Sequence, residues 1–429
     1  MSTLQAQSIT STASKARPQA RQATIACALG NALEMYDFTI YSFFAVVIAR
    51  NFFPAQSEVA SLLLSLTTFG VGFLMRPVGA VIIGRFADRH GRKSALSLTI
   101  GLMTLGTAMI AFAPTYHQIG FFGTLILITG RLVQGFSAGG EIGTASVFLM
   151  ESSTTSNRCH NVSWQAASQG YAALVGAGIG LLLSTVLTAD DLNQWGWRIP
   201  FILGLVIGPV GWYIRRCLPE THDAQSSTGA DHWRTHFDLR HTLLAIGLMA
   251  SATISIYLFI FYMPAYLTAS LGYPQRSALA IACVASACLA VITPIAGRFA
   301  DRHVLRKKLL VWTITLPVVL SGPGLYLLSL STNLALAMCV IAVLVLPGCI
   351  GSGAFFTLIM EAFPKRSRAL GTAVSYSFGV TLFGGFSPLI ATWLTSVLNN
   401  PLAPALYLFA GGVISLFCLA LYPENAGRE

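Results

Sequence analysis

Long apolar stretches alternate with short polar or basic segments along almost the whole chain. Most approach or exceed the ~20 residues that a helix needs to cross a bilayer core about 30 Å thick. We expect helices because backbone groups in lipid must pair within their own segment, and the short alternating strands of a barrel are not seen. The pattern therefore predicts an all-α membrane protein with twelve transmembrane helices, near residues 23–49, 58–83, 94–113, 119–150, 163–188, 198–215, 242–268, 277–296, 309–329, 334–360, 369–396 and 401–422.

The longest polar interval divides these spans into two groups of six. It predicts an N-terminal six-helix bundle over 23–215 and a C-terminal bundle over 242–422, joined by a cytoplasmic linker over 216–241. Residues 1–22 are polar and lack the compact apolar region of a signal peptide, so we expect a disordered cytoplasmic tail there. A second short tail follows at 423–429.

The composition agrees with a membrane protein. Hydrophobic residues make up 54% of the 429 residues and charged residues 10%, whereas soluble proteins carry about 25% charged residues. The mean hydropathy is +0.68. These values exclude a soluble enzyme, a disordered protein and a secreted disulfide scaffold. The eight cysteines show no C-x-x-C spacing, and we interpret them as small buried hydrophobic residues rather than metal ligands.

The basic residues predict the orientation of the chain. When successive loops are assigned alternately to two sides, 21 Lys and Arg residues fall on the side of the N-terminal tail and three on the other. Because loops rich in Lys and Arg stay in the cytoplasm, we expect both termini there. The formal charge of +10 is explained by these loops, and we expect a lipid bilayer rather than nucleic acid as the partner.

An internal repeat relates the two halves. Residues 84–90, Gly-Arg-Phe-Ala-Asp-Arg-His, recur unchanged at 297–303. Met150-Glu151 closes the fourth predicted span and Met360-Glu361 closes the tenth, at nearly the same offset. Both copies lie on the same side of the membrane, so the halves are predicted to be parallel repeats.

Two parallel six-helix halves are the architecture of major facilitator transporters, and the loops resemble that superfamily. Residues 84–93, Gly-Arg-Phe-Ala-Asp-Arg-His-Gly-Arg-Lys, resemble its G-x-x-x-D-R-x-G-R-K motif, and residues 131–135, Arg-Leu-Val-Gln-Gly, resemble its R-x-x-Q-G motif. The second copy of the loop motif departs from the pattern, because Val304 and Leu305 replace its x-Gly pair.

Further segments resemble one branch, the metabolite:proton symporters. The resemblance lies in residues 30–38, 76–79, 134–141 and 195–201. These relatives are bacterial inner-membrane carriers of citrate, tricarballylate, 2-oxoglutarate, shikimate, proline and betaine. Residues 163–169, Ser-Trp-Gln-Ala-Ala-Ser-Gln, look most like the citrate and tricarballylate carriers. The resemblance implies an inner-membrane location and transport driven by the proton gradient, without a cofactor or a metal.

Five ionisable residues lie inside the predicted spans, where a charge is costly unless it is paired or functional. They are Glu34, Asp37, Arg76, Arg131 and Glu141, all in the N-terminal half. This asymmetry places the proton chemistry in that half and neutral contacts in the other.

Glu34 and Asp37 share one helix face, and two carboxylates so close do not both ionise easily. One of them can therefore carry a proton. The placement of Asp37 also resembles sugar:proton carriers, in which a first-span Asp faces the fourth-span Arg. We favour Asp37–Arg131 as the switching pair over a permanent salt bridge between two helices.

The remaining candidates have two readings each. Glu141 lies two turns from Gln134 and is either a second proton site or a packing partner among glycines. Arg76 either binds substrate or pairs with Glu34 or Glu141. If the substrate is an anion, Arg76 or Arg131 should contact it, since a guanidinium matches a carboxylate.

The fifth predicted span carries a polar face made by Gln165, Ser168 and Gln169 at i, i+3 and i+4. Lipid cannot satisfy these groups, so the face turns inward, toward a neighbouring helix or the central cavity. We favour substrate binding in the cavity, together with Gln134.

A charge network is predicted at the cytoplasmic ends of the helices. In the superfamily such loops hold the two halves together when the carrier faces outward. The residues expected to form this gate are Gly84, Asp88, Arg89, Gly91, Arg92, Glu151, Arg158, Asp301, Arg302, Glu361 and Arg368.

The chain has no ATP-binding or zinc-protease motif and no His deep in a span, so we expect a transporter and not an enzyme. The predicted function is proton-coupled uptake of a small organic acid such as citrate, by alternating access and as a monomer. The alternatives are a proline- or betaine-type symporter, a drug exporter, and a membrane sensor or intramembrane enzyme. The clustered charges argue against the exporter, and nothing resembles a signalling domain or a catalytic constellation.

Overall fold

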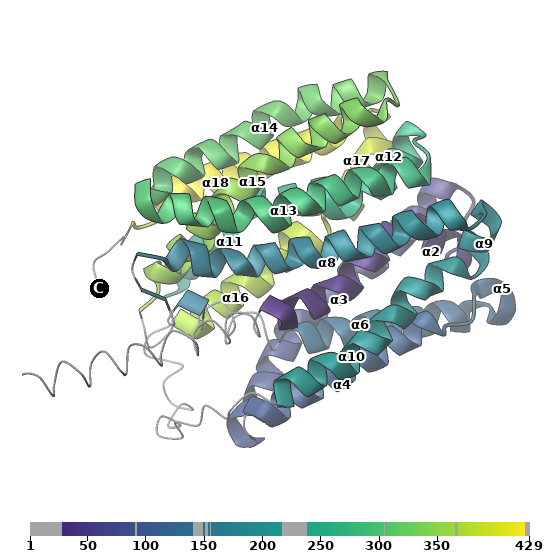
Figure 1. Ribbon diagram of the computed structural model, residues 1–429, viewed down its shortest axis with the longest axis horizontal. Helices are drawn as coiled ribbons and strands as arrows, with labels where there is room; N and C mark the ends of the chain where they lie inside the picture. The colour runs from purple at the N-terminus through teal and green to yellow at the C-terminus, as the bar shows by residue number, and fades with distance from the viewer. Residues whose placement is uncertain are drawn as a thin grey trace, which may run out of the picture.

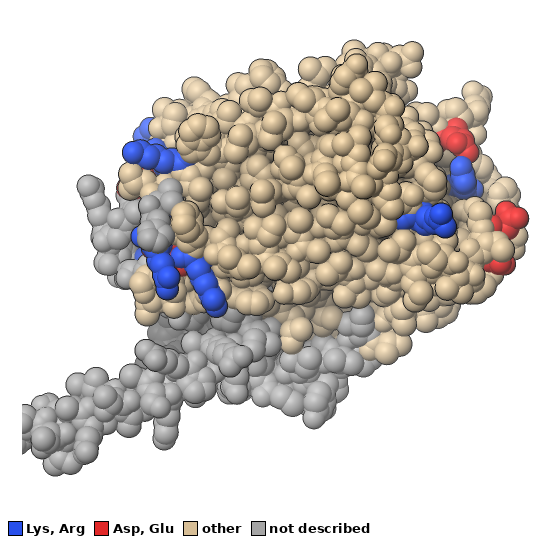
Figure 2. Space-filling view, turned by 45° about the horizontal axis from the view of Figure 1, so that its top comes forward, with Lys and Arg blue, Asp and Glu red and all other residues tan. Residues whose placement is uncertain are grey.

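The computed structural model describes residues 28–90, 92–139, 149–150, 153–154, 156–216, 238–303, 305–364 and 368–424. These residues form helices that run roughly parallel to one another in two neighbouring bundles (Figure 1). Their side chains form a wide uncharged belt, and the Lys, Arg, Asp and Glu side chains gather at the two ends (Figure 2). Such a surface is the one that a protein crossing a bilayer needs.

The N-terminal half consists of the first six spans and their connections. Its elements are the helix Ala28–Phe43, α2 (Ala45–Phe52), α3 (Glu58–His90), α4 (Arg92–Ala111), α5 (Tyr116–Ile119), α6 (Phe121–Ala138), α8 (Arg158–Val186), α9 (Ala189–Gln194), η1 (Gly196–Arg198) and α10 (Ile199–Arg216). The C-terminal half follows as α11 (Leu239–Ile256), η3 (Tyr257–Tyr262), α12 (Met263–Leu271), α13 (Gln275–His303), α14 (Arg306–Leu330), α15 (Leu334–Ala362), α16 (Arg368–Val380), η4 (Thr381–Gly385), α17 (Ser387–Leu398) and α18 (Ala403–Leu421).

These elements agree with the predicted twelve-helix architecture. Within the described residues, nine helices are long and apolar enough to cross a membrane, and a tenth span is the first helix with α2, bent by 65°. Two shorter apolar helices, Ser97–Ala111 and Gly196–Val206, lie where the third and sixth spans were expected. The structure extends several spans beyond the apolar segments, because basic and polar ends such as Ala87–His90 continue the helix past the hydrocarbon.

Three spans are broken near their middle. The first helix bends before Ala45, and the seventh and eleventh spans contain the π-helical turns η3 and η4. Such turns leave backbone groups outside the regular ladder and are frequent at functional sites. Here Thr381 in η4 donates its hydroxyl to the Phe73 carbonyl of α3 at 2.9 Å, and Ser42 donates to the Phe261 carbonyl of η3 at 3.0 Å. The breaks thus lie where the two halves meet.

Glycines bring α3 and α6 into backbone contact. A Cβ added to Gly135 would lie 1.6 Å from the Gly72 carbonyl oxygen, and one added to Gly79 would lie 1.9 Å from the Phe136 carbonyl oxygen. Only glycine fits this approach. It places Arg76 of α3 and Arg131 of α6 close to one another inside the N-terminal half.

The halves pack together along α8 and α13, which lie side by side (Figure 1). Gly170 of α8 approaches the backbone of α13 so closely that an added Cβ would lie 2.4 Å from the Ala290 nitrogen. This contact joins the fifth span of the first half to the eighth span of the second.

Candidate functional site

A chain of polar side chains links Asp37 to Arg131 inside the N-terminal half. Arg131 Nη1 donates to Gln134 Oε1 at 2.8 Å, and Gln134 Nε2 donates to the Thr107 hydroxyl at 3.0 Å. Thr107 in turn donates to Asp37 Oδ2. The chain crosses from α6 through α4 to the first helix, and all four side chains are 5% exposed or less.

Asp37 and Arg131 themselves form no direct hydrogen bond. Asp37 Oδ1 and the Nε and Nη2 atoms of Arg131 have no hydrogen-bond partner among the described residues. The switching pair expected from the sequence is therefore connected through two intermediates in this conformation. Thr107 is one of them, and the sequence gives no signal for it beyond a hydroxyl within an apolar span.

Arg76 lies at the same depth and is 1% exposed. Its Nη2 atom is 3.7 Å from Glu34 Oε1, which is close enough for an ion pair. This contact supports the pairing alternative for Arg76. Its Nε, Nη1 and Nη2 atoms have no hydrogen-bond partner in the part of the chain that the structure describes. Substrate binding by Arg76 thus stays a prediction.

Aromatic rings enclose both guanidinium groups. The Arg76 and Arg131 guanidinium carbons lie 4.7 and 4.6 Å from the centre of the Phe38 ring. Phe73 also contacts Arg76 at 4.4 Å, and Tyr41 contacts Arg131 at 4.4 Å. Cation–π contacts of this kind stabilise a buried cation without using its N–H donors. The donors remain available to an acidic ligand.

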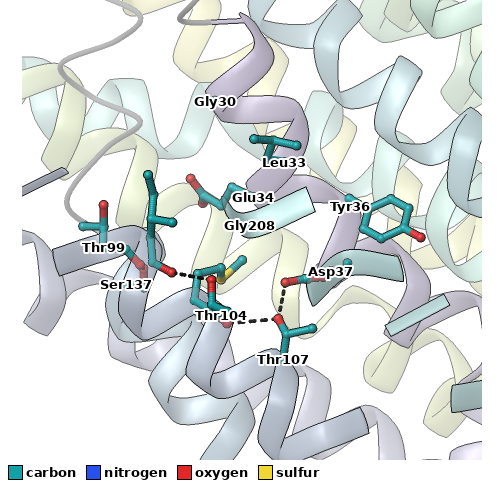
Figure 3. Close-up of a pocket in the computed structure, with 13 residues that line it drawn as sticks. Gly30, Leu33, Glu34, Tyr36, Asp37, Thr99, Thr104, Thr107, Ser137 and Gly208 are labelled. Carbon is teal, nitrogen blue, oxygen red and sulfur yellow. Dashed lines mark hydrogen bonds between the residues drawn. The ribbon is translucent and has the colours of Figure 1, made fainter. Parts of the chain in front are cut away.

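Two cavities adjoin this cluster. The first lies within the N-terminal half, between the first helix, α4, α6 and α10, and is lined by both Glu34 and Asp37 (Figure 3). The second lies between the halves and is lined by Gln169 of α8 and by hydroxyl and aromatic residues of the C-terminal half, among them Tyr257 and Tyr376. Each has about 50 Å³ that water can occupy.

The polar face of the fifth span is divided between two roles. Gln165 Nε2 donates to Asn31 Oδ1 at 3.0 Å, and Asn31 Nδ2 donates to the Ser168 hydroxyl at 2.7 Å. These bonds tie α8 to the first helix. Gln169 instead lines the cavity between the halves. Gln165 and Ser168 thus contact a neighbouring helix, and Gln169 faces a cavity. Substrate contact at all three residues stays a prediction.

The expected gate contains a charge cluster that spans the two halves. Glu361 of α15 forms ion pairs with Arg158 of α8 at 3.0 Å and with Arg306 of α14. Arg368, which is 2% exposed, donates from Nε to the Met360 carbonyl at 2.9 Å. Arg306 is one of the basic residues that the loop charges place on the side of the N-terminal tail, and its ion pair with Glu361 forms because α14 packs beside α15.

Asp301 closes the same end of the molecule. Its two carboxylate oxygens accept hydrogen bonds from the backbone N–H groups of Cys159 and His160, at 2.8 and 2.9 Å. These groups belong to the first turn of α8, where a negative charge is favoured. A carboxylate of the C-terminal half therefore caps a helix of the N-terminal half.

The other gate residues are less connected or undescribed. Gly84 lies in α3 with open space beside it, and Arg89 and Arg302 are exposed. Gly91 and Glu151 lie outside the described residues, as do the side chains of Asp88 and Arg92. Glu141, the candidate for a second proton site or a packing contact, also lies outside them. The predictions for these five residues stay open. No group of three or more His, Cys, Asp or Glu suited to a metal occurs in the described ranges.

Comparisons with known proteins agree with this architecture. The family model of the Major Facilitator Superfamily matches residues 27–379. A citrate-proton symporter of Klebsiella pneumoniae is 34% identical over 406 residues, which cover 92% of this chain and 90% of that protein. In Escherichia coli K12, a proline/betaine transporter is 30% identical over 95% of this chain and 84% of its own length, and an alpha-ketoglutarate permease is 32% identical over 87% of each. The crystal structure of a D-xylose-proton symporter superposes with a TM-score of 0.75 at 17% identity, covering 95% of this chain and 99% of that one.

Proposed function

Because the chain belongs to the major facilitator superfamily, we propose that it imports a small organic acid, best a di- or tricarboxylate such as citrate, together with protons. The protein is a multi-pass membrane transporter of the proton-coupled kind and not an enzyme. The proposal concerns the substrate and the way in which the proton is coupled to it.

The observation that carries the proposal is the pair of neighbouring guanidinium groups with free N–H donors. Five nitrogen atoms of Arg76 and Arg131 have no hydrogen-bond partner among the described residues, although both side chains are 1% exposed or less. A buried donor left without a hydrogen-bond partner costs about 1–3 kcal/mol, and more when the group is charged. Carboxylates of a substrate would satisfy these donors in the bidentate geometry that arginine favours.

The relatives carry different substrates, and the site favours the acids. A citrate-proton symporter and an alpha-ketoglutarate permease are named for acids with more than one carboxylate, and a proline/betaine transporter is named for zwitterions. The quaternary ammonium group of a betaine would need an open aromatic face. Here guanidinium groups already occupy the Phe38 and Phe73 rings. A zwitterion carrier is therefore our second candidate.

The hydrogen-bonded chain suggests how a proton and an acid bind together. While Asp37 is ionised, its negative charge compensates Arg131 through Thr107 and Gln134. When Asp37 takes up a proton, that compensation is lost, and the positive charge of Arg131 is left for a substrate carboxylate. The Thr107 hydroxyl can then turn to the Met103 carbonyl, 3.0 Å away. Proton binding would favour substrate binding, which is the condition for symport.

We place the carrier in a bacterial inner membrane with both termini in the cytoplasm. The bacterial relatives support the membrane, and the loop charges support the orientation. In that orientation the contacts of Glu361 and Asp301 close the cytoplasmic end. We further propose that it works as a monomer and needs no cofactor, since the proton gradient supplies the energy.

Uptake into proteoliposomes tests the substrate. Purified protein should accumulate a labelled di- or tricarboxylate when the outside is acidic, and citrate, 2-oxoglutarate, shikimate and proline are compared as substrates. Arg76→Lys and Arg131→Lys should each reduce acid uptake about tenfold or more, because a lysine lacks the planar donor fork. Arg50→Lys is the matched control, since Arg50 is half-exposed and pairs with Glu58 outside this cluster. Normal acid uptake by both Lys variants at unchanged protein levels would refute the role of the arginines.

A further inference from the structure

The cavity within the N-terminal half is separate from the interface between the halves. All of its lining residues belong to the first helix, α4, α6 and α10 (Figure 3). The cavity at the interface is lined mainly by α11, η3, α14, α15 and α16, with two residues of α8. No residue lines both cavities.

Polar side chains occur along the length of the cavity in the N-terminal half, among apolar ones such as Leu33 and Met103. Asp37 and Thr107 lie at one end, and Thr99 and Ser137 lie toward the other, with Thr104 between them (Figure 3). Its volume of about 50 Å³ holds a few water molecules, at roughly 10–15 Å³ each. Hydroxyl groups and carboxylates provide the partners that buried water requires.

The cavity runs toward one end of the bundle. Gly30 lies near the start of the first helix, Ser137 near the end of α6, and Thr99 in the first half of α4. The Arg-rich loop between α3 and α4 lies at this same end, which the proposed orientation assigns to the cytoplasm. Asp37 is thus linked by polar lining to the cytoplasmic end of its own half.

The two oxygens of Asp37 point to different surroundings. Oδ2 accepts the Thr107 hydroxyl and so belongs to the chain that leads to Arg131. Oδ1 has no hydrogen-bond partner among the described residues and faces α10, where a Cβ added to Gly204 would lie 2.8 Å away. The absence of a side chain at Gly204 therefore leaves room beside this oxygen.

We propose that protons reach and leave Asp37 Oδ1 through water in this cavity, which is separate from the cavity between the halves. A proton from cavity water forms the O–H bond at Oδ1 and converts the carboxylate to a neutral acid. The reverse step returns the proton to water. The inference rests on the proposed role of Asp37 as the proton carrier and adds the route by which the proton travels.

The groups around Asp37 suit such a route. On its own helix the described titratable neighbours are Glu34 and Tyr36. From the packed helices, α6 supplies Arg131 and α3 supplies Arg76, whereas the lining residues of α4 and α10 are neutral. Among the described residues, no Lys or Arg lines the cavity.

Glycine substitutions can narrow this cavity without altering a titratable group. Gly204→Ala places a methyl group against Asp37 Oδ1, and Gly208→Ala places one 2.7 Å from the Thr104 hydroxyl oxygen. The matched control is Gly101→Ala in α4, because a Cβ there meets nothing within 4 Å. Thr104→Val removes a water-binding hydroxyl while keeping the shape of the side chain.

The experiment measures hydrogen–deuterium exchange at the Asp37 carboxyl group by infrared difference spectroscopy. The band is identified by its loss in Asp37→Asn, at a pH where the band is present in the unmodified protein. We expect Gly204→Ala and Gly208→Ala to slow exchange about tenfold or more relative to Gly101→Ala. Thr104→Val should also slow exchange. Uptake driven by the pH gradient should fall in parallel, while citrate exchange at equal pH on both sides continues.

Exchange as fast in both glycine variants as in the control would overturn the route, and so would the lack of a protonated Asp37 band at every pH. These outcomes are distinct from failure of the proposed function. If the unmodified protein shows no proton-driven acid uptake, the substrate proposal fails, whereas slowed exchange in the variants still supports the cavity as the path to Asp37.

Discussion

The carboxylate of Asp37 is connected to Arg131 through a chain of hydrogen bonds and not through a direct ion pair. Thr107 and Gln134 pass its influence to Arg131, which lies on another helix. A protonation event on the first helix therefore changes the surroundings of a cation on α6. This is the smallest unit in which proton and substrate binding can be linked.

Replacement of Asp37 tests the carrier of the proton. Asp37→Asn should abolish uphill accumulation of the substrate driven by a pH gradient, since an amide does not take up or release a proton over the pH range of that gradient. Exchange of labelled for unlabelled substrate should persist, because asparagine resembles the protonated acid. Both rates can be measured in the same proteoliposomes, and full uphill transport by this variant would assign the proton to another group.

Replacement of Thr107 tests the chain itself. Thr107→Val keeps the shape but removes the donor to Asp37 and the acceptor for Gln134, and a bond to a charged group contributes about 1.5–3 kcal/mol. We expect proton-driven uptake to fall about tenfold or more relative to substrate exchange. Thr107→Ser should restore most of the rate, since the hydroxyl remains. Equal uptake by the Val and Ser variants would show that the hydroxyl is not needed.

Different parts of α8 contact three different parts of the molecule. Its first turn is capped by Asp301, its middle binds Asn31 through Gln165 and Ser168, and Gln169 lines the cavity between the halves. One helix thus contacts Asp301, the first helix and the cavity between the halves. The close approach at Gly170 keeps it against α13.

The two glutamines of α8 should respond differently to the same substitution. Gln169→Leu should change the ranking of competing carboxylates, because a polar site rejects ligands that leave its groups unpaired. Gln165→Leu should reduce the amount of folded protein by breaking the contact with Asn31, with less effect on the ranking. Competition assays at equal protein levels measure the first, and thermal unfolding in detergent measures the second. If Gln169→Leu leaves the ranking of competing carboxylates unchanged, the polar face of α8 has only a structural role.

At the scale of the whole molecule, contacts across the halves close the proposed cytoplasmic end. Glu361 joins Arg158 of the first half to Arg306 of the second, and Asp301 binds the N-terminus of α8.

Loss of this cap should shift the balance of conformations. Asp301→Asn removes a charge that interacts with a helix N-terminus, a contribution of about 1–2 kcal/mol, which corresponds to a shift of about 5–30-fold toward the form open at this end. Distances between spin labels at the exposed positions Ser94 and Lys308 should lengthen, as measured by double electron–electron resonance. Asp190→Asn, in the exposed first turn of α9, is the control. Identical distance distributions in both variants would contradict the role of the cap.

The sequence alone was enough to predict the number and type of the spans, the duplication, the family resemblance and the set of charges inside the spans. This was enough because an apolar stretch in lipid has only one regular structure, and because a charge inside it stands out. Helical spacing also showed that Gln165, Ser168 and Gln169 share a face.

Only the tertiary structure decided which groups meet. Arg76 lies beside Glu34, Asp37 reaches Arg131 through Thr107, and Gln165 and Gln169 separate between a helix contact and a cavity. Periodicity fixes the face of a helix but not its rotation against its neighbours or the helix that the face meets. Those depend on the close approach of glycines on different spans, which bring together residues far apart in the chain.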